Sequence, residues 1–109
     1  MENEKIEHGV PFVFADSILY QADGIVSKRI IQKEKGNITL FAFDAGQKLS
    51  EHTAPFDALV QVMHGSAEIV IGGKPTQLTA GQSIIMPANI PHAVNAIEKF
   101  IMLLTMIRE

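Results

Sequence analysis

The chain has 109 residues, of which 47% are hydrophobic and 19% are charged. This composition predicts one globular domain over residues 1–109 and excludes an intrinsically disordered chain. The formal net charge is −3, with nine Lys and Arg residues and no basic cluster, which argues against nucleic acid as a partner. No apolar run approaches the roughly 20 residues of a membrane-spanning helix, so a membrane partner is not expected either.

Short runs rich in Ile, Val, Phe and Thr alternate with Gly and Pro along the chain. Runs of this kind at intervals of about 8–12 residues predict an all-β sandwich or barrel. In chain order, we expect a frayed segment over about residues 1–8 and one helical turn within residues 16–20. We expect strands near residues 11–15, 25–31, 37–43, 58–63, 67–71, 76–79, 83–86, 92–96 and 100–107.

Glycines mark several of the expected turns. Gly72 and Gly73 supply the positive φ angles that a tight hairpin needs. Gly46, Gly65 and Gly81 are expected to be required by the backbone rather than by function, at turns with positive φ or close approach. Replacing such a glycine with alanine is expected to destabilise the fold by more than about 1 kcal/mol.

Cysteine is absent, which excludes disulfides and thiolate chemistry. The polar, acidic N-terminus lacks the apolar core of a signal peptide, and we therefore expect a cytoplasmic protein. Among the four histidines, His8 lies in a polar stretch and His64 beside a turn, so both are expected at the surface. His52 and His92 each adjoin an apolar strand bounded by Gly or Pro, and histidine is the commonest metal ligand in proteins.

The stretches around these two histidines resemble the two sequence motifs of cupins. Residues 46–65 follow the spacing G-x5-H-x-H-x3-E-x6-G, and residues 81–96 follow G-x5-P-x-G-x2-H-x3-N. The resemblance implies a cupin-type double-stranded β-helix, which is a jelly-roll barrel of two antiparallel sheets. The matching residues are Gly46, His52, Gly65, Gly81, Pro87 and His92.

In cupins, a divalent metal is bound by the two histidines and the glutamate of the first motif and by the histidine of the second. Here Ala54 stands at the second histidine position and Ala58 at the glutamate position. Only His52 and His92 carry over as metal ligands, so the resemblance implies a degenerate metal site. The other departures from the motifs are Asn89 and Ala96.

Two imidazoles hold a metal weakly without further ligands, and Asp57, Gln61 and Asn89 are possible helpers. Strand parity directs Asp57 away from the cavity unless a bulge turns it inward. Parity also favours an outward Gln61. The last strand adds Met102, which fills the core or lines an adaptable pocket. The expected lining of a rather apolar ligand-binding cavity is His52, Ala54, Ala58, Val60, His92, Met102 and Leu104.

Three roles for the histidine pair stay open: bonding to backbone or water at the barrel mouth, binding a ligand without metal, or forming a two-histidine metal site. They correspond to three functions. The first is binding or sensing of a small molecule. The second is a metal-dependent enzyme of the isomerase, dioxygenase or decarboxylase type with a non-standard third ligand. The third is a structural dimer module. The sequence favours the first, identifies no catalytic residue, and leaves a divalent transition metal as a possible cofactor.

We also expect a homodimer, which the resemblance to small cupins implies. An independent reason is that a barrel of this size leaves sheet edges and an apolar outer face that need covering. Four phenylalanines at alternating positions supply more aromatic surface than so small a core readily absorbs. They are Phe12, Phe14, Phe41 and Phe43.

Overall fold

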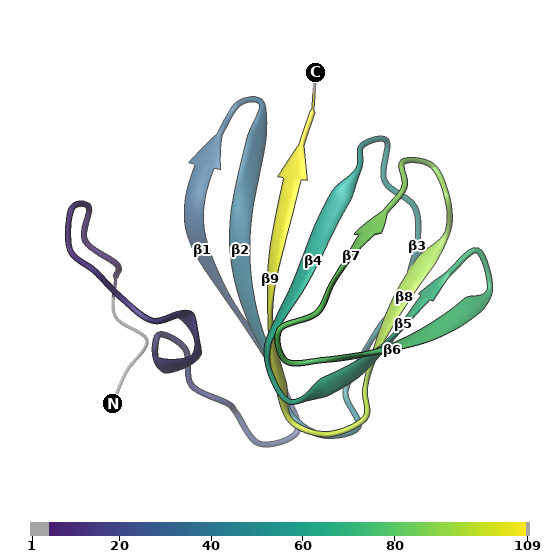
Figure 1. The fold of residues 1–109 in the computed structure, drawn as a ribbon, viewed down its shortest axis with the longest axis horizontal. Helices are drawn as coiled ribbons and strands as arrows, with labels where there is room; N and C mark the ends of the chain where they lie inside the picture. Colours follow the sequence, from purple (N-terminus) through teal and green to yellow (C-terminus); the bar gives the residue numbers. More distant parts are fainter. Residues whose placement is uncertain (1–4, 109) are drawn as a thin grey trace.

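The computed structural model describes residues 5–108, and within them lie nine strands and one short 3-10 helix (Figure 1). No helix in this range is long and apolar enough to cross a membrane. Part of the segment expected to be frayed, residues 1–4, falls outside the described residues. The elements are η1 (Phe14–Asp16), β1 (Ile25–Lys33), β2 (Gly36–Phe43), β3 (Lys48–His52), β4 (Ala58–His64), β5 (Ser66–Ile71), β6 (Lys74–Thr79), β7 (Ser83–Met86), β8 (His92–Ala96) and β9 (Phe100–Ile107).

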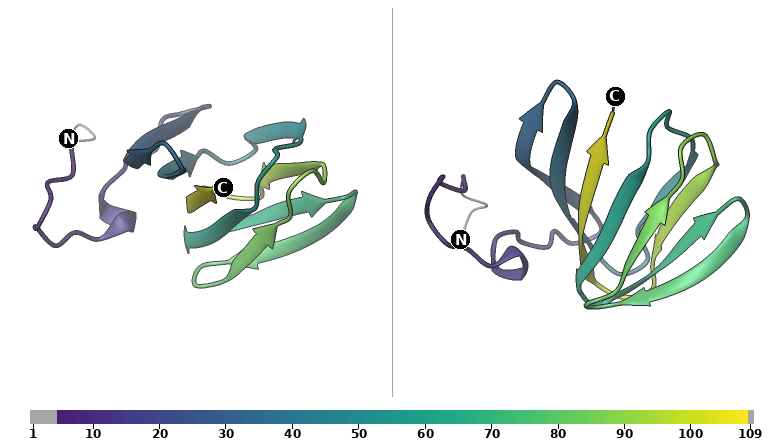
Figure 2. Two further views of the ribbon diagram at one scale, coloured as in Figure 1. Left: turned by 90° about the horizontal axis from the view of Figure 1, so that it is seen from above. Right: turned by 45° about the horizontal axis from the view of Figure 1, so that its top comes forward.

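The strands form two antiparallel sheets that face each other. The larger has the order β1-β2-β9-β4-β7, and the smaller has the order β3-β8-β5-β6. In Figure 1 the strands converge at the lower end and spread at the upper end, and Figure 2 shows the two layers from above. This arrangement confirms the predicted all-β fold and is that of a jelly-roll barrel.

Alternating side chains of the larger sheet divide between two apolar clusters, because successive residues of a strand point to opposite faces. The inner cluster lies between the sheets and contains Phe43, Val60 and Met102. The rings of Phe43 and Phe100 stack there with centroids 4.5 Å apart. The outer cluster lies beneath the segment that precedes β1, and its buried members are Ile18, Leu40, Ala42, Ile101 and Leu103.

The prediction of a strand at residues 11–15 is wrong. Phe14–Asp16 forms η1 instead, which overlaps the helical turn expected at 16–20 at one residue only. The Ser17 N–H donates to the Phe14 carbonyl at 3.0 Å, and the Ser17 hydroxyl donates to the Val13 carbonyl at 2.6 Å. In the described chain, no strand pairs with residues 11–15. A β-prone sequence without a hydrogen-bonding neighbour does not become a strand.

The sequence predictions omit β3, which forms an edge of the smaller sheet. Four of its five side chains are exposed, and Leu49 packs against the inner cluster. An edge strand that buries so little carries no apolar alternation, and this is the pattern by which the other strands were predicted. Its position matters because it ends at His52.

Candidate functional site

Strands β3 and β8 bring His52 and His92 together, although 40 positions separate them in sequence. The two residues are paired across the sheet, and their Nε2 atoms lie 3.2 Å apart. A register shift between Leu49 and His52 makes this possible. Without it, residues three apart would point to opposite faces, whereas here both Leu49 and His52 face the barrel. The irregularity therefore completes the pair.

Backbone carbonyls fix both imidazole rings. His52 Nδ1 lies 2.7 Å from the Ser50 carbonyl oxygen, and His92 Nδ1 lies 3.2 Å from the Ile90 carbonyl oxygen. A carbonyl only accepts hydrogen bonds, so each Nδ1 carries a proton and donates it. In a neutral imidazole the other nitrogen, Nε2, is then a lone-pair acceptor. The two Nε2 atoms that face each other are both acceptors when both rings are neutral.

The pair spans the boundary between the barrel interior and solvent. His92 is only 5% exposed, whereas His52 is exposed. Ile71 lies beside His92 across the sheet, and the Gly72 N–H donates to the Pro91 carbonyl at 2.8 Å. The hairpin between β5 and β6 is thereby tied to the loop that leads into β8. His52 is therefore the solvent-facing member of the pair, and His92 is its buried member.

The other residues expected to line the cavity occupy two environments. Ala58, Val60 and Met102 belong to the buried inner cluster, and Val60 and Met102 are 0% and 1% exposed. Leu104 packs against this cluster and is partly buried. Ala54 is also partly buried, and its carbonyl accepts the Asn89 N–H at 2.7 Å. Contact of these residues with a ligand stays a prediction.

The three possible helper ligands have other surroundings. Asp57 is exposed, and its Oδ1 accepts the Ala88 N–H at 2.8 Å. Gln61 is partly buried on β4. Asn89 lies at φ 66° in the loop before β8. Within residues 5–108, no three His, Cys, Asp or Glu side chains gather in a way that could hold a metal ion. Among the described residues, the histidine pair therefore has no third protein ligand of these types.

Sequence reasoning missed a polar cluster around Tyr20. The Tyr20 hydroxyl and His64 Nδ1 lie 2.9 Å apart, and Lys99 Nζ lies 5.4 Å from the Tyr20 ring centroid. Burial, and to a smaller extent the negative charge of Glu98, raise the pKa of Tyr20 above 10.0. Glu98 also accepts the Ser66 hydroxyl at 2.7 Å. These residues are scattered in sequence, so no local motif indicated that they meet.

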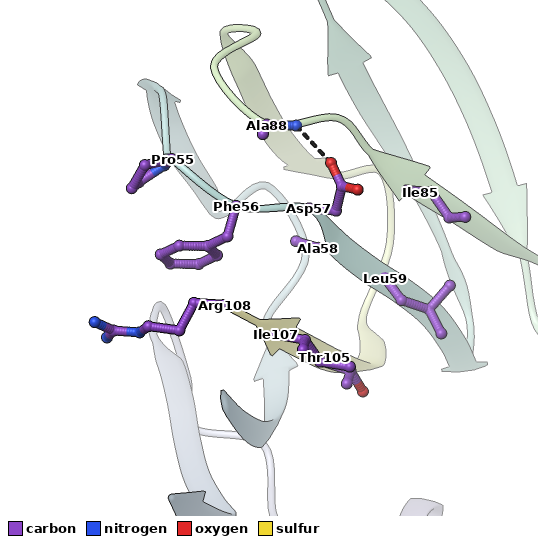
Figure 3. Close-up of a pocket in the computed structure, with 10 residues that line it drawn as sticks. All are labelled: Pro55, Phe56, Asp57, Ala58, Leu59, Ile85, Ala88, Thr105, Ile107 and Arg108. Atoms are coloured by element: carbon purple, nitrogen blue, oxygen red, sulfur yellow. Dashed lines mark hydrogen bonds between the residues drawn. The ribbon is translucent and has the colours of Figure 1, made fainter. Parts of the chain in front are cut away.

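A groove opens on the outside of the larger sheet, where strands β4, β7 and β9 meet the loop before β4 (Figure 3). Its volume is about 790 Å³, and neither His52 nor His92 lines it. The guanidinium carbon of Arg108 lies 5.7 Å from the Phe56 ring centroid at one side. The residues that line this outer groove are Pro55, Phe56, Asp57, Ala58, Leu59, Ile85, Ala88, Thr105, Ile107 and Arg108.

Comparison with solved structures yields matches over most or all of the chain. A conserved protein of unknown function from Streptococcus pyogenes is 35% identical with a TM-score of 0.92, and the match covers 100% of this chain and 96% of that one. A cupin 2 conserved barrel domain protein from Leptotrichia buccalis is 41% identical with a TM-score of 0.83, over 86% of this chain and 46% of that one. A cupin superfamily protein from Desulfitobacterium hafniense is 23% identical with a TM-score of 0.90, over 100% of both chains, and shows the shared fold.

No curated protein matches the chain. The family described as Cupin domain matches residues 39–108, which include β3, β8 and both histidines of the pair. The match covers more than half of the chain and agrees with the two-sheet barrel and with the cupin structures above. The chain therefore belongs to the cupin family.

Proposed function

We propose that the chain binds a small molecule at the open end of its barrel, with His52 and His92 as the polar contacts. The observation that carries this proposal is the 3.2 Å approach of the two Nε2 atoms. Two fixed rings present two acceptors toward one point. A small number of convergent polar groups beside apolar side chains is typical of a small-molecule site.

The protonation of the rings indicates the chemistry of the ligand. Two neutral imidazoles whose Nδ1 atoms both donate leave two lone pairs facing each other, which repel unless a proton or another positive group lies between them. A ligand hydroxyl or ammonium group placed near both Nε2 atoms would relieve this repulsion. Ile71 beside His92 and Leu49 at the base of β3 suit an apolar body attached to that group. We infer a compact ligand with one hydrogen-bond donor and an apolar remainder.

A second candidate function is metal-assisted, and the same distance favours it. Metal–imidazole bonds of about 2.0–2.1 Å place two neighbouring ligand nitrogens about 2.9–3.4 Å apart, and 3.2 Å lies in this range. His52 and His92 would hold the ion through Nε2, while the carbonyls at Nδ1 fix their orientation. A bound divalent ion would act as a Lewis acid toward an oxygen-containing ligand. Because two ligands are few, we rank this candidate second.

A thermal-shift screen of metabolites, run with and without a chelator and read beside elemental analysis, separates the candidates. For the first function, we expect a compound with a hydroxyl or amine to raise the melting temperature of chelated protein, and His52→Ala and His92→Ala to abolish the shift. His8→Ala is the matched control, because His8 is exposed and distant in sequence. Shifts that require added metal would support the second function. No shift with any compound or metal would leave the structural dimer module as the remaining function.

The lack of cysteine supports the cytoplasm as the place of action.

A further inference from the structure

The loop of residues 87–91, here called the rim loop, joins the two sheets next to the histidine pair. It connects β7 of the larger sheet to β8 of the smaller sheet, and it ends immediately before His92. Two of its five residues are Pro87 and Pro91, whose rings fix φ. Asn89 has a φ of 66°, in the left-handed region that few residue types other than glycine adopt readily. The backbone of the rim loop is therefore restricted at three of its five positions.

On one side, the rim loop is bound to the loop before β4. Asp57 Oδ1 accepts the Ala88 N–H at 2.8 Å (Figure 3), and the Ala54 carbonyl accepts the Asn89 N–H at 2.7 Å. These bonds continue the contact between β4 and β7 beyond the ends of the two strands. Asp57 contributes its side chain, so a substitution can remove this bond, unlike the backbone bond beside it.

On the other side, the rim loop is bound to the hairpin between β5 and β6. The Gly72 N–H donates to the Pro91 carbonyl at 2.8 Å. A Cβ atom at residue 72 would lie 3.4 Å from Ile90 Cγ2, so the hairpin also packs closely against the loop. Ile90 lies between the two anchored ends, and its carbonyl oxygen is 3.2 Å from His92 Nδ1. The position of this carbonyl therefore depends on both anchors.

The Ile90 carbonyl determines which ring nitrogen of His92 carries the proton. While Nδ1 donates to this carbonyl, Nε2 of the neutral ring is an acceptor. If the carbonyl moved away, the proton would be better placed on Nε2, which could donate it to His52 Nε2 at 3.2 Å. The two rings would then satisfy each other, and the pair would no longer present two acceptors. The rim loop thus selects between a pair that receives a donor and a pair that is closed.

We propose that Asp57 is a positioning residue: by holding the rim loop, it keeps His92 in the Nδ1–H form in which the pair receives the donor group of a ligand. Asp57 is exposed and lines the outer groove, which neither histidine of the pair lines, so it acts on the pair through the loop. This role differs from that of a metal ligand. Its consequence for ligand binding rests on the proposed function, whereas its effect on the His92 tautomer does not.

Long-range ¹H–¹⁵N correlation spectra of protein labelled with ¹⁵N-histidine show which ring nitrogen carries the proton. At about pH 8, where an ordinary histidine is neutral, we expect Nδ1–H forms of both His52 and His92 in the parent. Signals lost in His52→Ala and His92→Ala assign the two rings. Asp57→Ala should shift the ratio of the His92 tautomers toward Nε2–H at least about fivefold, the effect of one ordinary hydrogen bond. His52 is held by the Ser50 carbonyl and should keep its form.

Two further variants separate the hydrogen bond from the charge. Asp57→Asn keeps an oxygen acceptor and should restore the parent spectrum. Glu51→Ala is the matched control, because it removes an exposed carboxylate one residue from His52 and outside the rim loop. Circular dichroism melts verify that each variant is folded. An Nε2–H form of His92 in the parent, a parent-like spectrum of Asp57→Ala, or an Asp57→Asn chain that behaves like Asp57→Ala would overturn the proposal.

A titration with isobutanol, followed by the same histidine signals, tests the consequence for binding. Isobutanol has one hydrogen-bond donor and a compact apolar body, and its methyl ether lacks the donor. We expect the parent to bind the alcohol and not the ether. Asp57→Ala should bind the alcohol more weakly, in proportion to the fall in the fraction of His92 in the Nδ1–H form. If the tautomer shifts as expected but the parent does not bind isobutanol, the positioning role stands and the proposed function fails. Unchanged affinity despite a shifted tautomer would overturn the link between Asp57 and binding.

Discussion

A Cβ atom at residue 65 would overlap the carbonyl oxygen of Lys99, so the turn between β4 and β5 closes directly on the turn before β9. Gly65 also has φ 78°, in the left-handed region. Gly46 and Gly81 have φ of 83° and 93°, which confirms the positive φ expected at all three turns. A Cβ at either of these two would meet no heavy atom within 4 Å. The three glycines are therefore required for different reasons.

Alanine substitutions should separate these reasons. Gly46→Ala and Gly81→Ala incur only the strain of positive φ and are expected to lower the free energy of unfolding by about 1–2 kcal/mol each. Gly65→Ala adds a backbone collision and is expected to cost about 3 kcal/mol or more. Urea denaturation of the three variants measures this order. Equal losses at all three positions would mean that the two turns move apart easily.

Tyr20 should titrate above the ordinary tyrosine range. It is the chain's single tyrosine and there is no tryptophan, so phenolate absorbance reports this side chain alone. Burial and the charge of Glu98 raise its pKa above 10.0. The unfolded chain keeps the ordinary value, so the stabilising contribution is complete below pH 10.0 and is lost as the pH rises through the folded pKa.

Glu98→Gln is the corresponding variant. Removing the charge should move the Tyr20 pKa part of the way back toward 10.0, while burial, the larger cause, keeps it raised. Glu68→Gln changes the net charge equally and removes a carboxylate that accepts from Asn95, so it serves as the control. If Glu68→Gln moved the titration as far as Glu98→Gln does, the effect would come from net charge and not from the local cluster.

Asp44 should make the fold sensitive to acid. Its Oδ2 accepts the Asp23 N–H at 2.7 Å and its Oδ1 accepts the Ala45 N–H at 3.0 Å. These bonds lower the pKa of Asp44 below 3.8. The stabilisation is therefore complete above pH 3.8 and is lost as the pH falls through the folded pKa. Asp44→Asn should be less stable than the parent at pH 7, with the gap closing in strong acid. Melting temperatures across pH, with Asp16→Asn as the control, measure the gap; a gap that widened in acid would contradict the assignment.

Ala54→His together with Ala58→Glu should rebuild a metal site beside His52 and His92. Ala58 is 3% exposed, so a glutamate there is destabilising without metal, and overpacking adds about 1–3 kcal/mol. Three imidazoles and a carboxylate suit Mn, Fe, Co, Ni or Zn. At a hundredfold excess over the dissociation constant, metal should restore roughly 2.7 kcal/mol. The measurement is the melting temperature of the same variant with and without metal.

The control variant uses strand parity. Gln61 lies on β4 three residues after Ala58 and points to the other face. Ala54→His together with Gln61→Glu therefore adds the same groups without directing the carboxylate inward. It should show no comparable metal-dependent shift. Equal shifts in both double variants would mean that Ala58 does not face the histidine pair.

Local patterning predicted the strands that bury a face. β9 alternates large apolar side chains between the inner and outer clusters, and β4 places an apolar residue in the inner cluster at every second position; both patterns are visible in sequence. β3 escaped prediction because Leu49 is the only one of its five side chains that is even partly buried. Residues 11–15 were misassigned because strand formation depends on a neighbouring strand, and the sequence of a segment does not reveal whether one exists.

The candidate site, like the fold, was predicted only in part from the sequence. Motif spacing indicated that His52 and His92 occupy corresponding positions of one barrel. The resemblance to cupins therefore implied that the two side chains share one site. The register shift after Leu49 that turns His52 toward His92 is a backbone irregularity without a residue signature, so the sequence did not indicate how the chain brings them to 3.2 Å. The Tyr20–His64 contact joins residues 44 positions apart, and it depends on how the segment before β1 crosses the sheet.

The stacked rings of Phe43 and Phe100 close one end of the barrel interior. They lie where β2 ends and β9 begins, which is the end of the barrel opposite the histidine pair, and Val60 and Met102 fill the space above them. A guest entering beside His52 would reach solid packing within a short depth. Under the proposed function, the barrel should therefore select ligands by length: short, compact molecules would fit, whereas a long acyl chain or an oligomer would leave most of its body in water.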